Sequence, residues 1–131
     1  MTTREIKKIQ TDKAPQAIGP YSQAISAGDM VFVSGQIPIE PSSGEVITGA
    51  IEKETQLVID NTKSILTECG LTLDDVVKVD IFLKDMNDFT LVNDVYSNNF
   101  KGDVKPSRCV VQVARLPKDV GIEMSSIAFK G

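Results

Sequence analysis

The stretch "IEKETQLVIDNTKSILTECGLTLDDVVKVDIFLKD", residues 51–85, changes its hydrophobic period halfway along. In its first half, apolar and small side chains recur every three or four residues, and charged side chains lie opposite. This pattern predicts a helix over 51–69, with Gly70 as a natural stop just past its end. The second half alternates instead, which predicts a strand whose one face carries Val77, Val79, Ile81 and Leu83.

Working outward, short apolar stretches predict three strands before this helix, at residues 4–10, 21–27 and 30–35, with a turn at 27–29. A second helix is predicted from Asp88 to Phe100, with Asn93 at the edge of a stripe formed by Phe89, Val92, Val95, Tyr96 and Phe100. Two further strands are predicted at Ser107–Ala114 and at 121–129.

The predicted order is therefore β-β-β-α-β-α-β-β, an α+β fold with a mixed sheet. Both strand–helix–strand units must cross over right-handed, so both helices are expected on one face of the sheet. The other face has no cover within the chain. Yet both faces of the later strands carry apolar side chains, since Val76 and Phe82 lie opposite the face that carries Val77 to Leu83. An uncovered apolar face is usually an interface, which predicts an obligate homo-oligomer.

Histidine is absent from all 131 residues. This removes the commonest general base near neutral pH and the commonest transition-metal ligand. Two cysteines without histidine fall short of the usual zinc ligand sets, so we expect neither a metal nor a cofactor. Catalysis would have to rest on carboxylates, tyrosine, lysine, backbone groups or water.

The length suits one domain, expected to span residues 1–131. The formal net charge of −4 argues against a broad basic surface, so nucleic-acid binding is disfavoured. No apolar run is long enough to span a membrane, and the first residues lack the apolar core of a secretory signal. These features, with Cys69 and Cys109 as free thiols, predict a cytoplasmic protein.

The stretch "KPSRCVVQV", residues 105–113, puts an arginine at the start of an apolar strand. Alternation places Arg108 on one face with Val110, and Cys109 on the other. A lone arginine at a strand end is commonly a rim residue with its head in water. Its planar guanidinium could also grip a carboxylate or phosphate, and the apolar flanks favour this second hypothesis.

Glu123 alternates with Ile122 and Met124, so it belongs to the face that we expect to be uncovered. A salt-bridge partner is its commoner role, but beside Arg108 in a half-buried site it could deprotonate water. Ser34 and Gly35 end a strand, where glycine permits close approach of a ligand or simply makes a bend. Tyr21 follows a Gly-Pro turn and is either a packed tyrosine or a pocket residue.

The motifs "IGPYSQA" (18–24), "SGQIP" (34–38) and "VARLPKDVGIE" (113–123), with the helices between them, resemble the Rid family of reactive intermediate deaminases, also called YjgF-like or L-PSP proteins. The resemblance covers nearly the whole chain in order. It implies a chorismate-mutase-like fold and a homotrimer with sites between subunits.

The resemblance also implies a reaction and its residues. Arg108 would hold the carboxylate of a 2-imino acid, such as one derived from 2-aminoacrylate, and Glu123 would position the water that releases ammonia and a 2-keto acid. Substrate-binding positions would be Tyr21, Ser34, Gly35, Asn93 and the main chain near Val110. Many members carry a cysteine where this chain has Val110, with Cys109 one residue early.

Three functions remain open from the sequence. The first is hydrolytic deamination of small 2-imino acids. The second is a non-catalytic sensor of keto acids or amino acids that uses the same Arg108 clamp, although a pure binder has no need of Glu123. The third, an endoribonuclease or translation inhibitor, is disfavoured by the acidic charge and the missing histidine.

Overall fold

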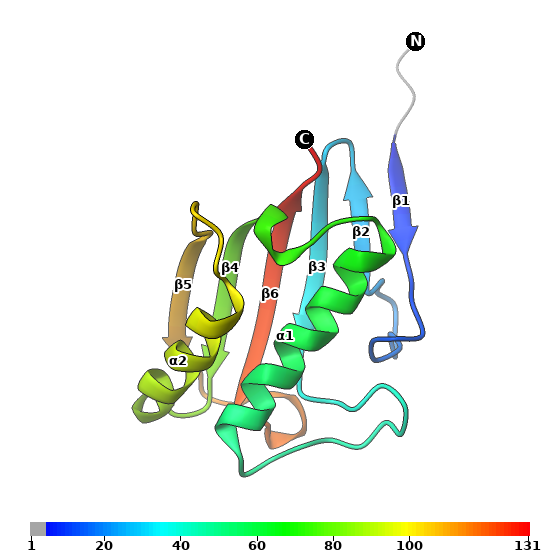
Figure 1. Ribbon diagram of the computed structural model, residues 1–131. Helices are drawn as coiled ribbons and strands as arrows, with labels where there is room; N and C mark the ends of the chain where they lie inside the picture. The colour runs from blue at the N-terminus through cyan, green and yellow to red at the C-terminus, as the bar shows by residue number, and fades with distance from the viewer. Residues whose placement is uncertain (1–4) are drawn as a thin grey trace.

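A computed structural model describes residues 5–131 as one mixed six-stranded sheet with two helices (Figure 1). Along the sheet the order is β1-β2-β3-β6-β4-β5, and only the pair β4–β5 is parallel. The strands are β1 (Ile6–Ile9), β2 (Ala24–Ala27), β3 (Met30–Gln36), β4 (Val76–Leu83), β5 (Ser107–Gln112) and β6 (Ile122–Phe129). The predicted element order and α+β class are confirmed, while residue 4 of the first predicted strand lies outside the described residues.

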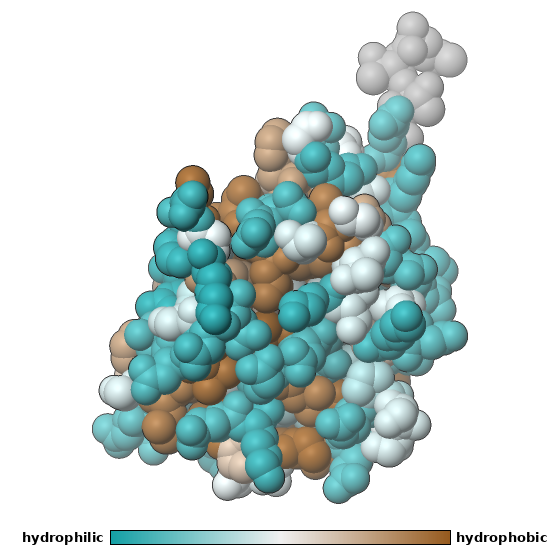
Figure 2. Space-filling model, in the orientation of Figure 1, coloured by the Kyte–Doolittle hydropathy of each residue, from teal (hydrophilic) through white to brown (hydrophobic). Residues whose placement is uncertain are grey.

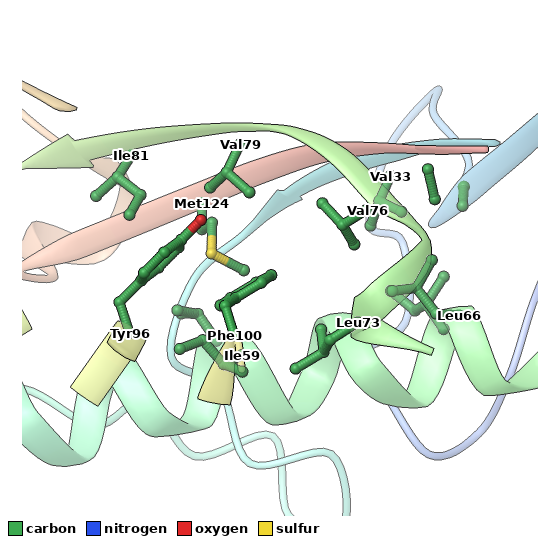
Figure 3. Close-up of a cluster of buried hydrophobic side chains, with 14 of the residues drawn as sticks. Val33, Ile59, Leu66, Leu73, Val76, Val79, Ile81, Tyr96, Phe100 and Met124 are labelled. Atoms are coloured by element: carbon green, nitrogen blue, oxygen red, sulfur yellow. The ribbon is translucent and has the colours of Figure 1, made fainter. Parts of the chain in front are cut away.

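Helices α1 (Ile51–Glu68) and α2 (Phe89–Asn99) lie on the same face of this sheet, as the two crossovers require (Figure 1). The core fills the space between this helix layer and β3, β4 and β6, and Figure 3 shows Ile59 and Leu66 of α1 facing Val79 and Met124 of the sheet. On the outside of this layer, hydrophilic side chains dominate, with apolar ones visible between them (Figure 2). Among residues 5–131, no helix is long and apolar enough to cross a membrane.

The other face of the sheet bears no helix. Alternation along β6 puts Glu123, Ser125, Ile127 and Phe129 on this side, as predicted, while the residues between them are buried. Three large apolar side chains of this face are 40–46% exposed, namely Phe32, Val111 and Phe129. We call this surface, formed by the outward side chains of β2 to β6, the uncovered face.

One face assignment on β4 is wrong. Val77 was predicted to share one face with Val79, Ile81 and Leu83, but it is 43% exposed, whereas these three and its neighbour Val76 are buried. The cause is a bulge: β4 advances from Val76 to Lys78 while β6 moves by one residue, from Ala128 to Ile127. An extra residue in one strand flips the alternation on one side of it, so Val76 faces the helices.

The predicted strand 21–27 begins only at Ala24, and the preceding Gln23 connects it to an earlier segment of the chain. Its side chain is buried, its Oε1 accepts from the Thr11 N–H at 2.8 Å, and its Nε2 donates to the Pro15 carbonyl at 2.8 Å. The amide therefore fastens the segment before β2 to the sheet and leaves the Tyr21 loop outside it. At the other edge, β5 ends at Gln112, two residues before the predicted Ala114.

Candidate functional site

Arg108 stands at the start of β5 and lies against α2. Its guanidinium carbon is 4.7 Å from the ring centroid of Tyr96 and 5.7 Å from that of Phe89. Its Nη1 donates to Oδ1 of Asn93 at 2.8 Å. Two aromatic faces and one amide thus fix the plane of the guanidinium while the residue stays exposed. We call these four residues the Arg108 cluster.

The three α2 residues of this cluster meet Arg108 because positions 89, 93 and 96 follow helical spacing and lie on one side of the helix. Tyr96 also stacks on Phe100, with ring centroids 4.2 Å apart, and Figure 3 shows its hydroxyl directed toward the sheet. Burial raises the pKa of Tyr96, and the positive charge of Arg108 opposes that rise only in part. Tyr96 is therefore uncharged at physiological pH, and its ring packs against the guanidinium.

No carboxylate among residues 5–131 forms an ion pair with Arg108; the two ion pairs of that part of the chain are Lys78–Asp80 and Arg115–Asp119. The guanidinium has five N–H donors, and the bond to Asn93 uses one of them. A planar cation with free donors in fixed positions suits a carboxylate, which can accept two parallel hydrogen bonds.

Glu123 lies in a separate cavity of about 460 Å³. Tyr21 and Gly35 line this cavity with it, together with Lys118 and an apolar wall of Pro15, Ile18, Ile37, Ile39 and Pro117. Burial raises the pKa of the Glu123 carboxyl above its ordinary value of 4.5. A half-buried carboxyl with a raised pKa is the kind of group that enzymes use as a general base. We call this space the Glu123 cavity.

Gly35 acts differently from the two roles considered for it in the sequence. A Cβ at position 35 would overlap the Glu123 carboxylate, so the space that glycine leaves is filled by Glu123 itself. The preceding Ser34 is half-buried and its Oγ donates to the carbonyl of Ser22 at 2.6 Å. This bond ties β3 to the loop that carries Tyr21.

The Arg108 cluster and the Glu123 cavity are on opposite faces of the sheet. Arg108 pairs in register with Val79, whose side chain faces the helices, whereas Glu123 pairs with Phe82, three residues further along β4 and on the uncovered face. The predicted residues therefore form two groups within one chain, Arg108 with Asn93 and Glu123 with Tyr21 and Gly35. A ligand that touches both groups must take them from different subunits.

Val110 and Cys109 follow Arg108 on β5. Val110 is half-buried and packs on the core, in register with Ile81. Cys109 is exposed and pairs with Asp80, so its thiol is on the uncovered face and away from the guanidinium of its own chain. The predicted alternation of these two side chains is confirmed.

The model of the endoribonuclease L-PSP family matches residues 11–130, nearly all of this chain. The chain belongs to this family, the Rid family. A RutC family protein of Pyrococcus abyssi is 57% identical over 122 residues, which cover 93% of this chain and 95% of the relative. An Escherichia coli relative provisionally named reactive intermediate deaminase TdcF is 44% identical, covering 95% of this chain and 97% of the relative.

Solved structures of Rid proteins share the fold. The crystal structure of Escherichia coli TdcF with bound serine has a TM-score of 0.91 at 43% identity and covers 95% of this chain and 99% of that one. A Thermotoga maritima protein described provisionally as an endoribonuclease has a TM-score of 0.91 at 53% identity, covering 95% of this chain and 98% of that one. This Rid chain thus has the same arrangement of two helices on a mixed six-stranded sheet.

Two parts of the candidate site were absent from the sequence predictions. Phe89 and Tyr96 were assigned only to the core stripe of α2, although they support the guanidinium. Their spacing around Asn93 was the available signal. The apolar wall of the Glu123 cavity combines the 15–18, 37–39 and 117 segments, which approach one another only through sheet pairing, so no local pattern reveals it.

Proposed function

We propose that this chain is a deaminase that hydrolyses small 2-imino acids, and their enamine tautomers, to 2-keto acids and ammonia. The observation that carries the proposal is the Arg108 guanidinium, oriented by Phe89, Tyr96 and Asn93 with no carboxylate partner among residues 5–131. Membership of a family that includes reactive intermediate deaminase relatives supports the same reaction.

In this proposal the substrate carboxylate accepts two hydrogen bonds from Arg108. The imine carbon of the bound substrate then faces the Glu123 cavity of a neighbouring subunit. Tyr21 closes one side of that cavity, Ser34 holds the Tyr21 loop, and Gly35 leaves room for the Glu123 carboxylate. The main chain at Val110, two residues after Arg108, would contact the imine nitrogen or the water. The reaction needs no metal or cofactor because an imine carbon is already electrophilic.

Hydrolysis then proceeds in two steps. Glu123 takes a proton from water while the water oxygen forms a bond to the imine carbon and the C=N electron pair moves to nitrogen. Glu123 returns this proton to the nitrogen, which gives a carbinolamine with a hydroxyl and an NH2 group on the same carbon. Glu123 then moves the hydroxyl proton to the NH2 nitrogen, so that the C–N bond breaks with ammonia as the leaving group and the electron pair left on oxygen forms the C=O bond. One imino acid and one water give one keto acid and one ammonia, and Glu123 returns to its starting form.

The proposal requires the uncovered face of one copy of the chain to meet the edge of the next copy where β5 and α2 carry Arg108. We propose that this association gives the homotrimer expected of a Rid protein, which acts in the cytoplasm as one 1–131 domain. Exposed Phe32, Val111 and Phe129 supply apolar area for this contact. Sedimentation at micromolar concentration should show a trimer. A stable, folded monomer under the same conditions would contradict both the oligomer and a site shared between subunits.

The activity is tested with an imino acid made in the cuvette by an amino-acid oxidase and trapped by semicarbazide. Active protein should lower the semicarbazone signal and raise the rate of keto-acid and ammonia release. If trimeric protein at concentrations approaching that of the substrate leaves both signals unchanged, the proposed function is wrong.

One observation favours a second candidate, a sensor that binds without turnover: the TdcF structure contains bound serine. In a sensor, Arg108 would hold the ligand carboxylate and Glu123 would take no part in proton transfer. Calorimetric titration with a 2-keto acid separates the two. Binding without any deaminase activity in the trapping assay would establish the sensor, whereas turnover supports the enzyme.

Replacing Cys109 with serine should leave most of the activity intact. The thiol is on the uncovered face, while the Arg108 guanidinium of the same chain is on the helix side, and the proposed reaction has no sulfur nucleophile. Cys69→Ser, at the end of α1, is the matched control. If Cys109→Ser lost turnover while Cys69→Ser kept it, and both remained trimeric, the displaced cysteine would have a catalytic role.

A further inference from the structure

Glu54 is a buried carboxylate that the proposed reaction does not use. It is in the first turn of α1 and is 2% exposed, although glutamate is almost never fully buried without a partner. Its Oε1 accepts from the backbone N–H of Gly121 at 2.7 Å, and its Oε2 accepts from that of Ala50 at 3.2 Å. One side chain therefore joins the start of α1 to the segment that precedes β6.

Gly121 is held closely at this point. A Cβ there would lie 2.9 Å from Cδ1 of Ile51 and 3.2 Å from Oε1 of Glu54, so any side chain at this position would push against both residues. Its carbonyl accepts from the backbone N–H of Lys84 at 3.0 Å. Glycine therefore lies between α1 and the end of β4 without displacing Ile51 or Glu54, and both of its backbone polar groups have fixed partners.

The residues just before Gly121 need such support. Lys118 and Asp119 have φ values of 59° and 55°, in the left-handed region that non-glycine residues seldom occupy. A backbone of this kind persists only where its surroundings hold it in place. The same segment supplies Pro117 and Lys118 to the Glu123 cavity, and Lys118 is the charged side chain that shares the cavity with Glu123.

We propose that Glu54 is a positioning residue for the deaminase: by holding Gly121 it fixes segment 117–121 and the start of β6, and so sets where Glu123 stands in its cavity. The inference rests on the proposed function for its kinetic consequences. Glu123 follows Gly121 by two residues, and its carboxylate fits only over Gly35, so a small shift of the backbone moves the base relative to the bound imine.

The test compares Glu54→Ala and Glu54→Gln with Glu52→Gln, an exposed glutamate in the same helical turn. Glu54→Ala should lower kcat by about tenfold to a hundredfold, the usual penalty for a base displaced by around an ångström, while KM changes little because the carboxylate clamp is on the other face of the sheet. Glu54→Gln keeps one acceptor and should fall in between. Glu52→Gln should match wild type.

A second readout needs neither substrate nor activity. The Glu123 carboxyl is titrated by ¹³C NMR in each variant, and in the Glu54 variants its midpoint should move toward the ordinary glutamate value because the loosened loop admits water. A loss of stability alone would not move that midpoint in folded protein. If Glu54→Ala does not fold, Glu54→Gln carries the same test.

The proposal is overturned if folded Glu54 variants keep both the wild-type kcat and the wild-type Glu123 midpoint. It is also overturned if KM rises and kcat does not fall, since that would place Glu54 in substrate binding. If wild type proves inactive, the proposed function fails, and the NMR titration still decides whether Glu54 positions Glu123.

Discussion

Replacing Arg108 with lysine should lower kcat/KM for a 2-imino acid almost as far as replacing it with alanine. Lysine keeps the charge but loses the planar fork that Tyr96 and Phe89 orient and that Asn93 anchors. A charge-assisted hydrogen bond contributes about 1.5–3 kcal/mol. The loss of one or two should therefore reduce kcat/KM by roughly tenfold to somewhat more than ten-thousandfold, since about 1.4 kcal/mol corresponds to one decade.

The matched control is Arg115→Lys, which changes an exposed arginine paired with Asp119 and should leave kcat/KM unchanged. Both lysine variants should stay trimeric, and their melting temperatures should remain within a few degrees of wild type, because cation–π contacts at exposed sites contribute only about 0.5–1 kcal/mol. Unfolding or dissociation of Arg108→Lys would make the arginine structural. Full activity with lysine would show that charge alone suffices.

Glu123→Gln should lower kcat/KM by about a hundredfold to ten-thousandfold, the range typical of a lost general base. In wild type, kcat/KM should rise with pH and level off once Glu123 is deprotonated, with a midpoint above the ordinary glutamate pKa of 4.5, because burial favours the uncharged acid. The variant should lack this rise. The imine substrate also titrates, and its titration affects both proteins equally. Dividing the wild-type kcat/KM by that of the variant at each pH therefore removes the titration of the imine.

The melting temperature of Glu123→Gln, compared with that of wild type, is the control for a loss of folding. Because the pKa of Glu123 is raised in the folded chain, its contribution to stability is greatest at low pH and falls as the pH rises through that pKa. At neutral pH the buried charge is a cost, and glutamine removes it, so Glu123→Gln should melt no lower than wild type. A wild-type pH profile in Glu123→Gln would show that another group deprotonates the water.

Local patterns predicted more of the fold than of the site. Helical and strand periods are properties of neighbouring residues, which is why the element order and the outward direction of Glu123 could be predicted. The bulge at Val77 could not, because it depends on how β4 pairs with a strand about 50 residues further along the chain. The burial of Glu54 likewise depends on Gly121, 67 residues away.

The candidate site shows the same division. Alternation placed Arg108 and Glu123 on particular sides of their own strands, but only the order β3-β6-β4-β5 reveals that the two sides are opposite. Phe89 and Tyr96 belong to the core stripe of α2 by their spacing, and their second role appears only when β5 lies beside that helix. The site depends on long-range pairing and, in our proposal, on a second copy of the chain.

The central claim is that one site combines Arg108 of one subunit with Glu123 of another, and mixed trimers test it directly. Arg108→Ala and Glu123→Gln chains, each strongly impaired alone, are co-expressed with different tags, and trimers carrying both tags are assayed for imino-acid hydrolysis. Every trimer that carries both tags contains one or two copies of each variant, and in either case about one of its three sites receives intact Arg108 from one variant and intact Glu123 from the other. The control pairs Arg108→Ala with the double variant, which can form no intact site.

We predict that the trimers with both tags regain about a third of wild-type activity and that the control pair regains none. Mixed trimers that stay as inactive as either variant alone would contradict a site shared between subunits.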